Sequence, residues 1–118
     1  MFLMLEMFDG TVNGGLNYAM EPSIDHIQAW KRNDLKEARR IWNSGLQKLN
    51  DFVYADYARL HVRYKIGAWL RGFVAHPFMR PPQPRAKAEE IKEMGRLLKG
   101  CGLTILPEGE IKKVSAKV

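Results

Sequence analysis

The chain has little of the residue types that build covalent or metal-held scaffolds. It contains a single cysteine, Cys101, which excludes an internal disulfide and a cysteine-based metal site. No histidine stands at an evident spacing from Cys101, so we interpret it as a small packed residue rather than a nucleophile. His26, His61 and His76 are too widely spaced for a metal-binding motif, and we interpret each as a helix-surface or capping residue. The sequence therefore predicts neither a metal nor a cofactor.

The sequence also lacks a long apolar run. Residues 1–8 are apolar apart from Glu6, but they are too short to span a bilayer and carry no basic residue of an export signal. We therefore expect no membrane association and a cytoplasmic location. Walker and dinucleotide-binding motifs are missing as well, because residues 10–15 do not have the required glycine spacing.

Basic residues are missing from the first thirty positions. Residues 1–30 hold four acidic residues and no lysine or arginine, whereas all 19 basic residues fall in residues 31–118, and the formal net charge is +6. A basic surface permits nucleic acid or anionic ligands. Because charges of both signs are interleaved in residues 36–40, we favour a solvated helical surface and do not expect nucleic-acid binding.

Apolar periodicity predicts a mainly α fold with about four helices and at most one short strand. The predicted helices cover residues 22–31, 34–49, 52–70 and 86–99. We expect Asn33–Asp34 to form a turn and an N-cap, and Asn50–Asp51 to separate the second helix from the third. The one candidate strand lies in the glycine-rich residues 11–17, with a loop after it. Residues 1–8 could be a helix end or a strand start.

Residues 64–84 begin as helix and end as an extended arm. Arg71–Gly72 is typical of the end of a helix. Pro77 disfavours helical geometry at His76, and the prolines at 81, 82 and 84 favour an extended segment with few N–H donors.

Several short motifs, taken in order, resemble the C-terminal part of the dihydrodipicolinate synthase / N-acetylneuraminate lyase family. The resemblance covers roughly residues 8 to 104. Its motifs are Gly10–Asn17, Asn33–Arg39, Lys65 with Leu70 and Gly72, Arg80-Pro-Pro-Gln-Pro84, and Gly102–Leu103.

The family resemblance implies that this chain is the end of a (β/α)8 barrel lyase. A chain of 118 residues is too short for a whole barrel, which needs ~200 residues or more. The implied domain covers residues 1–105: a barrel-strand and loop remnant (1–21), helices (22–73), a proline-rich arm (74–85) and a last helix (86–105). Residues 106–118 are predicted to be a loose polar tail.

The resemblance also implies a chemistry, in which a lysine forms a Schiff base with a pyruvate-like keto acid, assisted by a tyrosine. Both catalytic positions lie upstream of this chain, so no catalytic residue is predicted here. By resemblance alone, Val12, Asn13 and Asn17 would lie near the substrate. Lys65 matches a family lysine outside the Schiff-base position. The tyrosines of the third helix, Tyr54, Tyr57 and Tyr64, are interpreted as core or interface residues.

Two functions are therefore open. The first is the C-terminal segment of a lyase of this family, not catalytic alone, which would meet a keto-acid substrate only as part of a longer chain. The alternative is a stand-alone basic helical interaction module that self-associates or binds nucleic acid, although no helix-turn-helix signature is present. In either case uncovered apolar faces predict a homo-oligomer, or pairing with the missing barrel portion.

Overall fold

A computed structural model describes residues 11–118 of the chain; the expectations for residues 1–8 lie outside the described residues. The α-helices are α2 (Met20–Lys31), α3 (Leu35–Ile41), α4 (Gln47–Tyr54), α5 (Leu60–Leu70), α6 (Ala88–Gly100) and α7 (Glu108–Ser115). Shorter turns are the 3-10 helices η1 (Gly14–Asn17) and η3 (Tyr57–Arg59) and the π-helical turn η2 (Trp42–Leu46). Residues 11–118 contain no strand, so the predicted mainly helical class is confirmed, whereas the candidate strand in residues 11–17 is wrong: η1 forms there instead.

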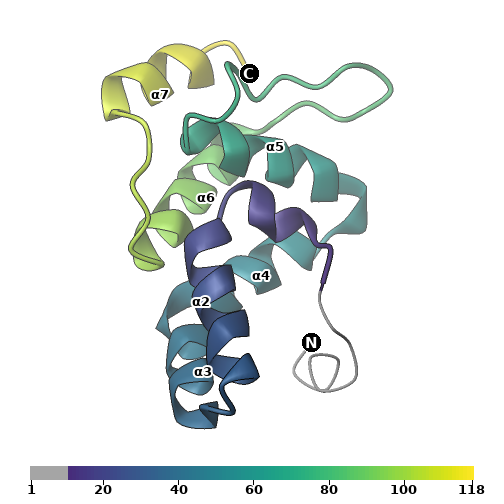
Figure 1. Cartoon of the computed structure of the whole chain (residues 1–118). Coiled ribbons are helices and arrows are strands. Elements are labelled where there is room, and N and C mark those ends of the chain that lie inside the picture. Colours follow the sequence, from purple (N-terminus) through teal and green to yellow (C-terminus); the bar gives the residue numbers. More distant parts are fainter. Residues whose placement is uncertain (1–10) are drawn as a thin grey trace.

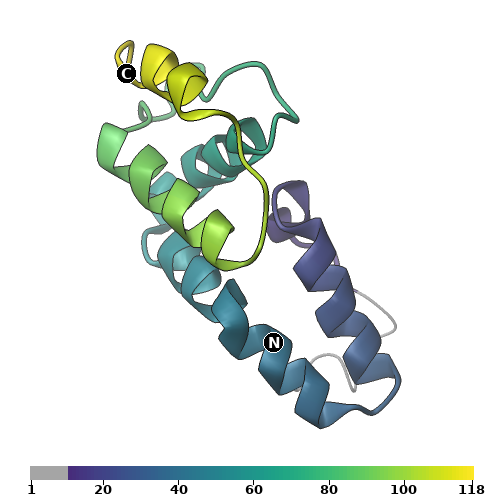
Figure 2. The ribbon, with the colours of Figure 1, turned by 90° about the vertical axis from the view of Figure 1, so that its left-hand side faces the viewer.

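The helices form an elongated bundle of 46 × 29 × 21 Å (Figure 1). α2 and α3 make an antiparallel hairpin at one end, and α3, η2 and α4 continue as one long bent rod (Figure 2). α5 and α6 pack beside each other in the middle, while α7 lies at the other end (Figure 1).

The hairpin of α2 and α3 turns where the sequence predicts it. Asn33 adopts the left-handed conformation with φ 59°, and the Asp34 side chain accepts a hydrogen bond of 3.0 Å from the backbone N–H of Glu37. Ala29 and Ala38, both fully buried, let the two helices approach closely. The predicted turn and N-cap are confirmed.

The predicted break at Asn50–Asp51 is wrong. The Asn50 amide donates to the carbonyl oxygen of Leu46 at 2.9 Å, so its side chain bonds within the helix and α4 continues to Tyr54. The chain breaks at Asp56 instead, whose carboxylate accepts a hydrogen bond from the N–H of Ala58. An Asn–Asp pair is compatible with a helix whenever the amide can reach a carbonyl one turn back.

The core is built around α5, which is buried nearly all round, as predicted for its part of residues 52–70. η1, α4 and α6 pack against it, and α2 packs in turn against η1. The largest fully buried side chains of this core are Tyr18, Leu49, Val53, Val62, Ile66, Trp69, Leu70, Ile91, Met94 and Leu98.

The end of α5 follows the predicted glycine pattern, and the C-terminal segment differs from prediction. Gly72 (φ 79°) and Gly102 (φ 75°) stop α5 and α6. The residues expected to be a loose tail form α7, with Ile111 and Val114 packed against the core. Their three-residue spacing, with acidic residues in the first turn and lysines in the last, is a helix signal that the polar composition obscured.

Candidate functional site

A groove of about 660 Å³ lies between the start of α2, one face of α5 and the residues leading into the arm. We call it the arm groove. Its apolar lining is Leu16, Met20, Tyr64, Ala68, Phe73, Val74 and Met79. Its polar lining is Asn17, His61 and Lys65. A concave, mostly apolar surface with a few polar groups is the usual form of a binding site.

The wall formed by η1 is pressed tightly onto α5. A Cβ atom on Gly14 would lie 2.1 Å from the Tyr64 ring, and one on Gly67 would lie 2.7 Å from Cγ of Tyr18. Tyr64 and Gly67 are three residues apart on one face of α5. The chain at η1 packs closely there because a glycine faces a tyrosine ring at both contacts. Gly14 therefore makes room for the Tyr64 ring.

The structure brings one of the three predicted substrate-adjacent residues into the groove. Asn17 lines it, with its amide donating to the carbonyl oxygen of Gly14 at 3.1 Å. Asn13 instead caps η1, its side-chain oxygen accepting a hydrogen bond of 2.6 Å from the N–H of Gly15. Val12 is fully exposed and is not part of the groove lining.

Tyr64 lines the groove and contacts two further tyrosines that are not part of the lining. The hydroxyl of Tyr64 donates to that of Tyr54 at 2.8 Å, and the ring of Tyr18 lies 6.0 Å from the Tyr64 ring. Burial raises the pKa of Tyr18, and burial together with the Tyr54 hydrogen bond raises the pKa of Tyr64. Both phenols are therefore neutral at physiological pH and are poor bases. Tyr57, in contrast, is largely exposed and lies outside the core.

Lys65 holds the arm. Its ammonium group donates to the carbonyl oxygen of Phe78 at 2.5 Å, a contact between residues thirteen positions apart. Pro77 is buried and Met79 packs against the core, so the arm is anchored on either side of that carbonyl. The sequence singled out Lys65 and the arm separately, but nothing in it indicated that they meet.

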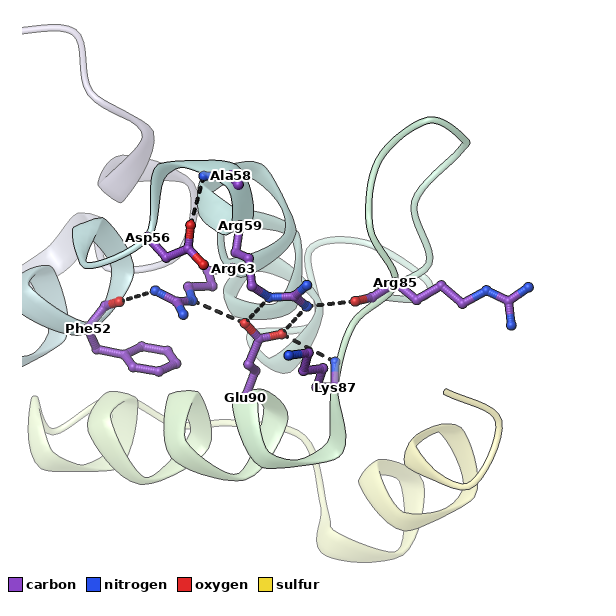
Figure 3. Close-up of polar contacts among 8 residues, drawn as sticks. All are labelled: Phe52, Asp56, Ala58, Arg59, Arg63, Arg85, Lys87 and Glu90. Carbon is purple, nitrogen blue, oxygen red and sulfur yellow. Dashed lines mark hydrogen bonds and ion pairs between the residues drawn. The ribbon is translucent and has the colours of Figure 1, made fainter.

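A buried ionic cluster fixes the other end of the arm (Figure 3). Glu90 at the start of α6 accepts hydrogen bonds from Arg59 and Arg63, whose side chains are 12% and 11% exposed. Arg59 also donates to the carbonyl oxygen of Arg85 at 2.6 Å, and Arg63 donates to that of Phe52. The cluster therefore joins α4, α5, α6 and the last residue of the arm.

The charge balance of this cluster favours the ionised carboxylate. Burial by itself would raise the pKa of Glu90, but the hydrogen bonds and charge of Arg59, followed by the hydrogen bond of Arg63, outweigh it and lower that pKa. The side chain of Glu90 also accepts a hydrogen bond from the N–H of Lys87, which caps α6. Nothing in the sequence indicated that Glu90 would meet these two arginines.

The three histidines lie in separate places. The prediction of a surface or capping role is wrong for His26, which is fully buried, accepts a hydrogen bond from Trp30 and stacks on Trp42. His61 meets the Tyr64 ring edge-on at the groove, and His76 stacks on the ring of Phe78. Among the described residues, no three metal-ligating side chains come together.

Comparison with family models, with curated protein sequences and with solved structures returned no match. Among residues 11–118, no helix is long and apolar enough to cross a bilayer. The functional assignment therefore rests on the residue pattern and on the geometry of the groove.

Proposed function

We propose that this chain is the C-terminal portion of an enzyme of the dihydrodipicolinate synthase / N-acetylneuraminate lyase type, and that the rest of the barrel covers the arm groove. The ordered motifs between residues 10 and 103 support this origin. A helical segment with a bent arm before its last long helix is also what the resemblance implies for the end of such an enzyme.

The observation that carries the proposal is the exposed apolar surface around the arm groove. Met20, Phe73 and Val74 line the groove and are 46%, 56% and 38% exposed, and Ile24 continues the same face of α2. Large side chains gathered on one surface of a small protein mark a site of contact with another protein surface. The missing barrel portion is the partner that the family resemblance supplies.

In this proposal the chain contributes surface and support rather than the reacting groups. The Schiff-base lysine and its tyrosine belong to the missing portion, as the resemblance implies. Asn17, at the lip of the groove, is the one residue of those assigned to the substrate by resemblance that could meet a keto acid arriving from the barrel side. Lys65 donates to the arm and acts as a structural group.

The mass of the protein in the cells that make it tests the proposal most directly. A species of 13.6 kDa alone would overturn it, because the barrel portion would then be missing. A species of at least roughly twice that mass, as a full barrel requires, is expected.

Trapping with borohydride provides a second test. Incubation of this chain with pyruvate and borohydride is expected to add no mass, whereas the longer species should gain one reduced adduct upstream of residue 1. An adduct on Lys65 would contradict the structural role assigned to that lysine.

A further inference from the structure

A second groove, of about 520 Å³, lies between α6 and α7 and opens to solvent. We call it the α6–α7 groove. Its floor is apolar: Ala88, Ile91, Gly95, Ile105 and Ile111. It shares no lining residue with the arm groove, so an inference about it does not rest on the proposed function.

Positive charge borders the α6–α7 groove. Lys92, Arg96 and Lys99 stand at four- and three-residue spacing, so they form one stripe about 10 Å long on α6. Lys112 lies on the α7 side, and Glu108 is the one acidic residue of the lining. The stripe runs beside the apolar stripe of Ala88, Ile91 and Gly95 on the same helix.

Two of these four cations are available to a ligand without the loss of an ion pair. Lys112 lies 4.0 Å from Glu108, and Arg96 is paired with Glu93 in the next turn. Within residues 11–118, Lys92 and Lys99 make no ion pair, and both are exposed. A matching ligand therefore presents an apolar face to the floor and carboxylates to the stripe.

We propose that the α6–α7 groove binds an acidic amphipathic helix of a partner protein. Two neighbouring helices with an apolar floor accept a third helix through side chains at helical spacing. Carboxylates two turns apart along its edge would face Lys92 and Lys99, which gives the site a preference for acidic sequences.

Two other ligand classes fit the groove less well. Single-stranded nucleic acid binds through bases stacked on aromatic side chains, and no aromatic residue lines this groove. A fatty acid is held best when most of its surface is enclosed, whereas this groove is open.

The test uses the full chain and a labelled helical peptide of leucine and glutamate, with leucine on one face and glutamate along both edges. A peptide of the same composition in scrambled order controls for charge alone. Fluorescence anisotropy is expected to show binding of the helical peptide and not of the scrambled one. Equal binding of both peptides would overturn the proposal, because it would reflect net charge rather than the groove.

Charge reversal on the stripe locates the site. The variant Lys92→Glu with Lys99→Glu is expected to weaken peptide binding by about tenfold, because two exposed attractive charge pairs are lost and replaced by repulsive ones. The matched control, Lys36→Glu with Lys48→Glu, makes the same change in net charge on α3 and α4 and is expected to bind within about twofold of the parent. An equal loss in both variants would contradict the proposal, provided circular dichroism shows all proteins equally folded.

Two further outcomes would assign the groove to another occupant. Laurate binding that is lost in the Lys92→Glu, Lys99→Glu variant, without peptide binding in the parent, would identify an acyl-chain site. Loss of self-association in that variant, measured by light scattering, would identify a second copy of the chain as the occupant. Either result would overturn the proposed partner.

Discussion

The carboxylate of Glu90 is the counter-ion shared by two guanidinium groups that are themselves nearly buried. Its removal would leave the positive charges of Arg59 and Arg63 without a counter-ion at the junction of α4, α5, α6 and the arm. An uncompensated charge in such a place costs far more than the loss of a surface ion pair.

Glu90→Gln is therefore expected to lower the free energy of unfolding by about 3 kcal/mol at pH 7. Urea denaturation followed by circular dichroism measures this. Glu93→Gln is the matched control: it lies one turn away and breaks the exposed pair with Arg96, so little change is expected. Equal losses of unfolding free energy in the two variants would show that the buried cluster stabilises the fold no more than the exposed pair does.

The same contact predicts a dependence on pH. Because the folded state lowers the pKa of Glu90 below its ordinary value of 4.5, the stabilisation is fully present above pH 4.5 and is lost as the pH falls through the folded-state pKa. The difference in unfolding free energy between the parent and Glu90→Gln is expected to shrink below pH 4.5. A difference that stays constant down to pH 2 would exclude ionised Glu90 as its source.

At the scale of the elements, the rod of α3, η2 and α4 bends at Gly45. Its φ is 138°, and a Cβ atom there would lie 2.8 Å from the carbonyl oxygen of Gly100. The sequence predicted one continuous amphipathic helix over residues 34–49. A single π-helical turn, which adds one residue, changes the spacing of apolar residues too little to be recognised in the sequence. The bend depends on the approach of α6, a contact between distant parts of the chain.

Gly45→Ala is expected to destabilise the protein by about 1–3 kcal/mol, because both the backbone conformation and the space are unsuited to a side chain. Gly109→Ala provides the control. Gly109 lies in the exposed first turn of α7 with no atom near its missing Cβ, so alanine there is expected to be neutral or to stabilise by up to about 1 kcal/mol. The midpoint temperature of thermal unfolding is expected to fall in Gly45→Ala and to stay unchanged or rise in Gly109→Ala.

The arm is an element without secondary structure, held by a few contacts. Lys65→Met removes the hydrogen bond to the carbonyl of Phe78 and is expected to raise local opening of the arm about fivefold. The rate of chymotrypsin cleavage after Phe78 reports this opening. Lys48→Met, at an exposed position of α4, should leave the rate unchanged, and an unchanged rate in both variants would show that the other anchors suffice.

At the scale of the whole molecule, the uncovered arm groove predicts self-association of the chain when no barrel portion is present. Light scattering over a dilution series is expected to give a mass above 13.6 kDa that falls on dilution. Met20→Lys with Phe73→Ser should reduce this association, because both side chains line the groove and are already exposed. Tyr57→Ser, which removes an exposed ring elsewhere, serves as the control, and a monomer at every concentration would contradict the prediction.

The sequence by itself determined the local features of this protein. Apolar periodicity predicted the mainly helical class, Asp34 predicted an N-cap, and Gly72 marked the end of α5, because each depends on residues within one or two turns. The same local logic missed α7, whose two apolar residues gain their stability by packing on the rest of the fold.

Only the tertiary structure decided which distant residues meet. Glu90 lies 27 and 31 positions from its two arginines, and the arm groove joins residues 16 to 79 of the chain. Of the predicted site residues, Asn17 reached the groove while Val12 and Asn13 did not, since their positions depend on how η1 packs against α5. Such contacts depend on how the surfaces of whole helices pack against one another, and a single sequence carries no direct signal of that packing.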